Sequence, residues 1–222
     1  MADFPPTSIA GNAILNRKSA RKMLQQARAI SAQTPDAMEQ SLQGSDLQAQ
    51  IEELAKSDGF RRQYATNMLA EILDAAIKGT KADMGNVQLY DPKAARLIIL
   101  VQHGFRRPFL DFFDSVHSGE AACGSALQAA SRVVVPDVTD TPIFRSVDSL
   151  EVLLDAGVRS VQSTPIVGKS GAVLGMLSTH YRTVGTFAER GLEVIDHFAA
   201  KAAAIIEWQQ RTALRYGDAS RP

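Results

Sequence analysis

The chain has 222 residues, of which 45% are hydrophobic, and its 24 basic side chains balance 24 acidic ones. This length suits one large domain or one domain with an appendage, and the apolar share is enough for a substantial core. The balanced charge gives no support for binding to nucleic acid or to an anionic membrane surface. The longest run of large apolar side chains, residues 97–101, is far too short to cross a bilayer.

The N-terminus and the cysteine content bear on the compartment. Residues 1–6 lack the basic and apolar regions of a signal peptide. The single cysteine, Cys123, excludes an intramolecular disulfide framework and any metal site built from several cysteines. We therefore expect a cytoplasmic protein.

The first 58 residues are predicted to form a helical extension. Residues 1–16 carry prolines and little periodicity, and we interpret them as a loose arm. Residues 17–33 are rich in the helix formers Arg, Lys, Gln and Ala. Thr34 and Pro35 then have the order of an N-cap and a first helical residue, which predicts a second helix to about residue 56.

The pattern changes after a third helix, which apolar residues at helical spacing predict over residues 60–78. Strands are predicted over 84–91 and 95–103, joined by a turn at residues 91–93. Short helices are predicted over 106–117 and 124–130, and a β-branched strand over 132–135. A further helix is expected between residues 148 and 157.

A hairpin and a long helix complete the predicted fold. Strands over 159–167 and 172–182 are joined by a glycine-containing link, and a capping box at Thr186 and Glu189 begins a helix that runs to about residue 212. Residues 213–222 are polar and predicted to be a flexible tail. Because hairpins dominate, we expect an α+β domain over residues 59–212, with a mainly antiparallel sheet and helices packed on it.

The last helix carries two apolar stripes. The first consists of Leu192, Ile195, Ala199, Ala202 and Ile206, and the second of Val194, Phe198, Ile205 and Trp208. One stripe suffices to dock a helix on a sheet, so the second indicates another partner, either the N-terminal helices or a second subunit. The alternative is that both stripes belong to the core of one chain.

Polar residues alternate with apolar ones along three predicted strands. Asn86 and Gln88 do so on the first strand, Gln162 on the next to last, and Ser178 and His180 on the last. Alternation with a period of two places each set on one face of the sheet. A half-solvated sheet face explains this pattern. The functional alternative is a cavity whose wall needs a few hydrogen-bonding groups among apolar ones.

Four phenylalanines follow the second predicted strand: Phe105, Phe109, Phe112 and Phe113. Helical spacing places the last three largely on one face. Such a cluster is usually part of a core. If a cavity lies beneath it, these rings form its roof and the short helix acts as a lid.

Cys123 and the histidines are the candidates for chemistry. Cys123 stands near a predicted helix start, where the helix dipole lowers a thiol pKa, so a redox-sensing or nucleophilic role is one hypothesis. A lone cysteine beside small residues is more often a small buried hydrophobe. No base and orienting group accompany it, and the four histidines lack zinc-site spacing. We therefore predict no catalytic residue and no metal site.

Several segments together resemble a GAF domain of the bacterial signalling type, over about residues 60–210. Residues 82–90 (ADMGNVQLY) resemble its first-strand motif, and residues 122–127 (ACGSAL) its short helix before the middle strand. Residues 132–137 (RVVVPD) and 142–144 (PIF) resemble the following strand and loop, while 156–165 and 174–181 resemble the closing hairpin. The subtype is similar to GAF domains found beside bacterial histidine kinases.

The resemblance implies a six-stranded antiparallel sheet with terminal helices on one face, often in a dimer, and a ligand pocket on the other. Three subtypes fit poorly. A glycine follows Cys123 where bilin-binding domains have a Cys-His pair, and one cysteine cannot supply the cycle of the methionine-sulfoxide-reducing type. The asparagine-lysine pattern of cyclic-nucleotide-binding domains is missing. No kinase, phosphodiesterase or helix-turn-helix segment is found.

We therefore expect a non-catalytic sensory module of a two-component or related bacterial signalling system. It binds an unidentified small molecule and transmits the signal through a helical homodimer or to a signalling partner, with no nucleic-acid or membrane contact and no cofactor assigned. The candidate pocket residues are Asn86, Gln88, Phe105, Phe109, Phe112, Phe113, Cys123, Gln162, Ser178 and His180. The alternative is a thiol-based redox sensor or enzyme centred on Cys123.

Overall fold

The computed structural model describes residues 53–144, 147–185 and 187–216. The chain divides into two units, Met1–Glu53 and Leu54–Pro222, so the division falls before the expected boundary at residue 58. The helices expected before residue 53, the capping residue Thr186 and residues 217–222 of the expected tail lie outside the described residues. Within the described ranges, no helix is both long and apolar enough to span a membrane.

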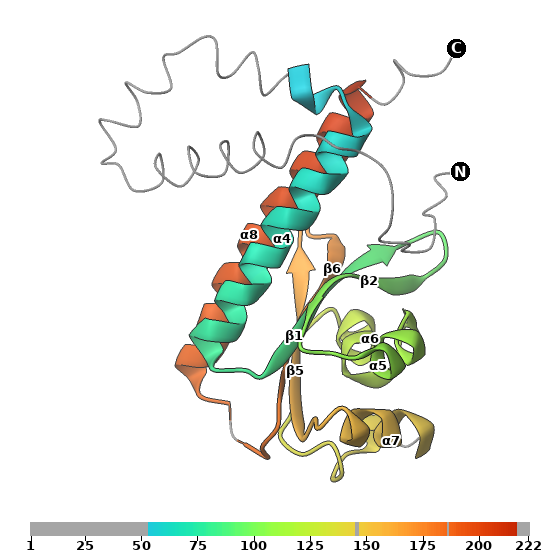
Figure 1. Ribbon diagram of the computed structural model, residues 1–222, viewed down its shortest axis with the longest axis vertical. Helices are drawn as coiled ribbons and strands as arrows, with labels where there is room; N and C mark the ends of the chain where they lie inside the picture. Colours follow the sequence, from blue (N-terminus) through green and yellow to red (C-terminus); the bar gives the residue numbers. More distant parts are fainter. Residues whose placement is uncertain (1–52, 145–146, 186, 217–222) are drawn as a thin grey trace. The chain divides into compact units, whose positions relative to one another are not determined.

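The second unit is built on a six-stranded antiparallel sheet in the order β3-β2-β1-β6-β5-β4 (Figure 1). The strands are β1 (Met84–Asp91), β2 (Arg96–His103), β3 (Ser115–His117), β4 (Val133–Val135), β5 (Ser160–Val167) and β6 (Val173–Tyr181). The first and last long strands of the domain, β1 and β6, are hydrogen-bonded neighbours at its centre. The α+β fold expected from the sequence is confirmed.

Helices cover both faces of this sheet, and each face has its own core. Two long helices, α4 (Asp58–Thr80) and α8 (Glu189–Tyr216), lie side by side along one face (Figure 1). The other face is covered by α5 (Arg107–Phe112), α6 (Ala121–Ala129), the 3-10 turn η1 (Pro142–Phe144) and α7 (Val147–Asp155). We refer to these as the long-helix face and the short-helix face.

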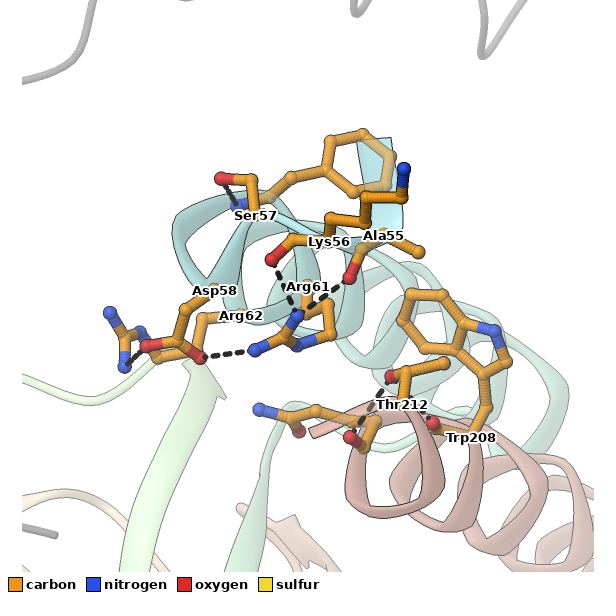
Figure 2. A network of polar contacts seen from close by, with 10 residues as sticks. Ala55, Lys56, Ser57, Asp58, Arg61, Arg62, Trp208 and Thr212 are labelled. Atoms are coloured by element: carbon orange, nitrogen blue, oxygen red, sulfur yellow. Dashed lines mark hydrogen bonds and ion pairs between the residues drawn. The ribbon is translucent and has the colours of Figure 1, made fainter. Parts of the chain in front are cut away.

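The start of α4 explains why the unit begins at Leu54. The hydroxyl of Ser57 accepts a hydrogen bond from the backbone N–H of Phe60 and so caps the helix. The Arg61 guanidinium is buried, donates to the carbonyls of Ala55 and Lys56 at 2.6 and 3.0 Å, and pairs with Asp58 (Figure 2). These bonds fasten residues 55–58 to the first turns of α4.

Both apolar stripes of α8 are used within one chain. The first stripe packs on the sheet, where Ile195, Ala199, Ala202 and Ile206 are buried. The second stripe meets α4: the Trp208 ring lies 4.9 Å from that of Tyr64, and Val194 and Phe198 lie beside Gly79. The second stripe is therefore covered by α4 and requires no second subunit.

The expected helix over residues 106–117 is wrong in its second half. Helix α5 ends at Phe112, and Ser115–His117 form the edge strand β3, in which Val116 is buried opposite Leu97 of β2. The first residues of β2 offer unpaired backbone groups, and pairing with them outweighs the local helical pattern. Two other boundaries move as well: α6 begins at Ala121, and α8 continues to Tyr216.

Two glycines allow close approaches that shape the short-helix face. A side chain at Gly175 in β6 would meet the carbonyl oxygen of Gln88, which lies on the neighbouring strand β1. A side chain at Gly124 would meet the carbonyl oxygen of His117, so this glycine lets α6 lie directly against β3. Because α6 packs this closely, its first turn lies over the sheet beside Gln88.

Candidate functional site

Strand register brings the polar residues of three strands together on the short-helix face. Asn86 of β1 lies opposite Ser178 of β6, which lies opposite Ser163 of β5. The two serine hydroxyls are hydrogen-bonded at 2.8 Å. His180 begins the next row, opposite Val161. Residues directly opposite each other share a face, so these side chains form one polar strip across the centre of the sheet.

A cavity of about 20 Å³ lies between this strip and the short helices. The sheet contributes Asn86, Gln88, Val161, Ser163, Ser178 and His180, and the cover contributes Phe109, Phe113, Ala121, Ala122, Cys123, Phe144 and Leu153. Its volume is room for about one water molecule. The lining contains no Asp, Glu, Lys or Arg side chain.

Three buried side-chain atoms on the cavity wall have no hydrogen-bond partner: Asn86 Oδ1, Gln88 Oε1 and His180 Nδ1. These residues are only 4, 1 and 5% exposed. The other unpartnered buried side-chain atoms among the described residues are Nε atoms of three arginines, which do not line the cavity. Leaving a buried donor or acceptor unpaired costs about 1–3 kcal/mol, so the wall is built at the expense of stability.

Gln88 links the sheet to Cys123. The register of β1 with β2 shifts between Val87 and Gln88, an irregularity of the kind that re-aims side chains beside functional sites. The Gln88 side chain hydrogen-bonds to the Cys123 thiol. Burial nevertheless raises the pKa of that thiol to about 11, an effect larger than the lowering by this bond. The position of Cys123 near the start of a helix had suggested a lowered thiol pKa, and this is wrong. Cys123 does lie in the first turn of α6, but burial raises the pKa of its thiol by more than other effects lower it.

His180 is enclosed by aromatic rings. The edge of its imidazole meets the ring of Phe105 at 4.9 Å and that of Phe109 at 6.0 Å. Burial lowers the pKa of His180 to about 3. The imidazole is therefore neutral at physiological pH.

Seven of the ten predicted pocket residues line the cavity: Asn86, Gln88, Phe109, Phe113, Cys123, Ser178 and His180. Phe105 does not line it but is buried behind the roof, with its ring stacked on that of Phe109 at 3.7 Å. Phe112 is 43% exposed and is not part of the roof. It lies in the last turn of the six-residue α5, where Phe109 and Phe113, four residues apart, share the inward side.

Gln162 lies on the opposite face of the sheet, so its assignment to the pocket is wrong. Its neighbours Val161 and Ser163 line the cavity, and alternation along β5 turns Gln162 toward the long helices. It is fully buried and hydrogen-bonded: its Nε2 donates to Thr179 Oγ1 at 3.1 Å, and its Oε1 accepts from Thr164 Oγ1 at 2.8 Å.

These bonds belong to a chain of polar contacts on the long-helix face. Arg132 donates from Nε to Thr164 Oγ1 at 2.9 Å, and its Nη2 donates to the carbonyl of Leu192 and pairs with Asp196, both in α8. At the other end, Thr179 Oγ1 is hydrogen-bonded to the Tyr181 hydroxyl at 3.2 Å. This series of polar contacts therefore joins strands β5 and β6 to helix α8.

Six lining residues were not predicted: Ala121, Ala122, Phe144, Leu153, Val161 and Ser163. Counting back from the hairpin turn does not find Ser163, because the register of β5 with β6 shifts between Ile166 and Val167 before Ser163 pairs with Ser178. Phe144 and Leu153 carry no local signal, because only the packing of η1 and α7 on the sheet brings them there. In the described part of the chain, no group of three or more His, Cys, Asp or Glu side chains is placed to hold a metal ion.

Comparison with known proteins places this architecture in a family. A family model described as a GAF domain matches residues 65–207. No curated protein matches the chain. Solved structures share the fold at low sequence identity. One is the GAF domain of an Acinetobacter phosphoenolpyruvate-protein phosphotransferase, at 15% identity and a TM-score of 0.56, which covers 69% of this chain and 86% of that one.

Two further structures differ in what their proteins do. A domain from a Sinorhizobium meliloti 1021 protein assigned as a two-component sensor histidine kinase is 19% identical, with a TM-score of 0.54, covering 68% of this chain and 94% of its own. The free methionine-R-sulfoxide reductase of Neisseria meningitidis, solved with its substrate, is 17% identical, with a TM-score of 0.53, covering 69% and 88%. With the family match over residues 65–207, the chain belongs to the GAF domain family.

Proposed function

We propose that this GAF domain is a non-catalytic sensory module that binds a small molecule between the polar strip of the sheet and the short helices. The observation that carries the proposal is that three residues lining one cavity, Asn86, Gln88 and His180, each have a buried side-chain atom without a hydrogen-bond partner. A ligand that supplies hydrogen-bond partners removes their desolvation cost. The shared fold with a domain from a protein assigned as a sensor kinase is consistent with this role.

Ligand entry requires the cover to move, because about 20 Å³ holds little more than one water molecule. Helix α5 is the part of the cover best suited to move. It has six residues, its N-cap Arg106 makes no side-chain capping bond, and Phe112 on its last turn is exposed. Displacing Phe109 and Phe113 with α5 enlarges the space over the polar strip while the sheet stays in place.

Transmission to α8 follows from the alternation of the two central strands. The cavity is lined by Ser163, Ser178 and His180. The residues next to them in sequence, Gln162 and Thr179, are hydrogen-bonded to each other on the other face of the sheet. A ligand that shifts β5 against β6 changes these bonds, and Arg132 carries the change to Leu192 and Asp196 of α8. We propose this chain as the coupling between pocket and output helix.

The binding proposal is tested with the double variant Asn86→Leu, Gln88→Leu. We expect it to be as stable as wild type or more stable, because it removes two unpaired buried oxygens, and to lose at least about tenfold in ligand affinity, or about 1.4 kcal/mol. Native mass spectrometry of protein purified from its own host measures retained ligand, and thermal unfolding measures stability. A double variant that loses stability while retaining the same compound would show that these amides are structural, which contradicts the proposal.

The alternative function, a redox device centred on Cys123, is separated by Cys123→Ser. At neutral pH the thiol is protonated, since burial raises its pKa to about 11, and a protonated thiol is a poor nucleophile. We expect the variant to retain ligand within about twofold of wild type, a difference of about 0.4 kcal/mol. Loss of a methionine sulfoxide reductase or peroxide-reducing activity on this substitution would favour the alternative and refute the non-catalytic proposal.

We further propose that the domain forms a homodimer through the end of the α4–α8 pair. Leu214 is 85% exposed and Tyr64, in contact with Trp208, is 37% exposed, so large apolar side chains gather at this end. We expect sedimentation at tens of micromolar, a concentration suited to a moderate interface, to show a dimer, and Leu214→Glu to shift it toward monomer. Wild-type protein that sediments as a monomer under these conditions would refute this assembly.

A further inference from the structure

We infer that the ligand of this pocket is an uncharged compound that presents at least two N–H or O–H donors beside a flat apolar group. The inference rests on the proposed binding function and adds the chemical class of the ligand. Its basis is the identity of the unpartnered atoms, the lack of charge on the lining and the aromatic cover.

The unpartnered amide atoms are both acceptors. Asn86 Oδ1 and Gln88 Oε1 belong to residues on the same face of β1, which are two positions and therefore about 7 Å apart along the strand. An amide oxygen accepts hydrogen bonds and cannot donate them. A ligand that satisfies both oxygens must therefore carry at least two donor hydrogens. A compound that has only acceptors, such as a ketone or an ester, leaves the Asn86 and Gln88 oxygens unpaired. Its own carbonyl oxygen then becomes a further buried group without a partner.

The lining cannot compensate a charge. None of its thirteen side chains is Asp, Glu, Lys or Arg, and His180, with a pKa lowered to about 3 by burial, is neutral at physiological pH. Moving a carboxylate, phosphate or ammonium group into such a site costs several kcal/mol because no opposite charge lies in the wall. A carboxylate is disfavoured twice, since it would also face the acceptor oxygens of Asn86 and Gln88.

The cover supplies the apolar half of the site. Phe109, Phe113 and Phe144 present aromatic rings, and Leu153 lies beside them. The Phe109 and Phe113 rings are 4.7 Å apart and tilted by 44°, so a flat ring stacks on either of them as the cover opens. A primary amide attached to a small ring combines both halves: its two N–H donors face the strip, and its ring faces the cover.

Three probes of equal size and different chemistry test this class on the full chain. Benzamide is neutral and carries two N–H donors, acetophenone is neutral with an acceptor only, and benzoate is an anion without donors. We expect benzamide to bind at least about tenfold more tightly than either of the others, measured by ligand-detected NMR titration at millimolar concentrations. The advantage should vanish in Asn86→Leu, Gln88→Leu and persist in the control Phe112→Ala, whose exposed ring does not line the cavity.

The outcomes separate the ligand class from the function itself. Acetophenone binding as tightly as benzamide would overturn the requirement for donors, and benzoate binding as tightly would overturn the requirement for neutrality, while either would leave the binding function supported. A charged compound retained in native mass spectrometry would also overturn the class alone. If none of the three probes binds and no compound is retained, the binding function fails and the inference falls with it.

Discussion

Acidification from about pH 7 to about pH 4.5 is expected to destabilise the domain by about 2–3 kcal/mol through His180 alone. Burial lowers the folded-state pKa of this imidazole from its ordinary value of 6.5 to about 3. Below pH 6.5 the unfolded chain therefore binds a proton that the folded domain does not. The contribution of His180 to the free energy of unfolding is fully present above pH 6.5. It decreases as the pH falls and levels off near pH 3, where the imidazole of the folded domain is protonated too.

Urea unfolding at several pH values measures this contribution when wild type is compared with His180→Gln. Other groups titrate identically in both proteins, so the difference between their stability curves isolates His180. Wild type should lose about 2–3 kcal/mol more than the variant over this range. Parallel curves would mean that the imidazole is hydrated in the folded protein, which would also remove it from the set of unpartnered atoms at the pocket.

The same substitution on opposite faces of the sheet is expected to have different effects. Gln88 and Gln162 are equally buried, at 1% and 0% exposure, but only Gln162 has both its amide groups paired with side chains of its own face. Gln162→Leu removes one hydrogen bond from Thr164, which keeps Arg132, and one from Thr179, which keeps Tyr181, and should destabilise the domain by about 2 kcal/mol. Gln88→Leu removes an unpaired oxygen together with the hydrogen bond to the Cys123 thiol, and should leave stability within about 1 kcal/mol of wild type.

Thermal or denaturant unfolding of the two single variants provides the comparison, since each serves as the control for the other in size and chemistry. The sign of the difference decides the matter. If Gln88→Leu is as destabilising as Gln162→Leu, the Gln88 amide has structural partners in solution and the case for a ligand-binding strip is lost. If Gln162→Leu has no effect, the polar chain from Tyr181 to Arg132 contributes nothing to coupling β5 and β6 to α8.

The two faces of β5 and β6 are consistent with the proposed sensory role. Each strand presents cavity residues on one side and hydrogen-bonded polar residues on the other, so the proposed binding site and α8 lie on opposite faces of one sheet. On the cavity side, Asn86, Gln88 and His180 each have an unpaired buried atom, whereas Gln162, Thr164 and Thr179 on the side of α8 are hydrogen-bonded. The proposed ligand would supply partners on the cavity side while the bonds toward α8 stay in place.

The sequence by itself determined the order of most helices and strands. It also determined which residues of a strand lie on the same face of that strand. Helical spacing predicted α4, and period-two alternation grouped Asn86 with Gln88 and Ser178 with His180, because these patterns depend only on local backbone geometry. The α+β class followed from the succession of hairpins.

Only the tertiary structure decided which faces coincide and what covers them. Alternation makes Gln162 as good a candidate as Ser163, and the register of β5 with β6 alone assigns Ser163 to the cavity and Gln162 to the long helices. The helical pattern of residues 106–117 gives no sign that the edge of β2 pairs with residues 115–117. The thiol of Cys123 has a raised pKa because burial outweighs its place near a helix start, and burial depends on contacts between segments far apart in the chain.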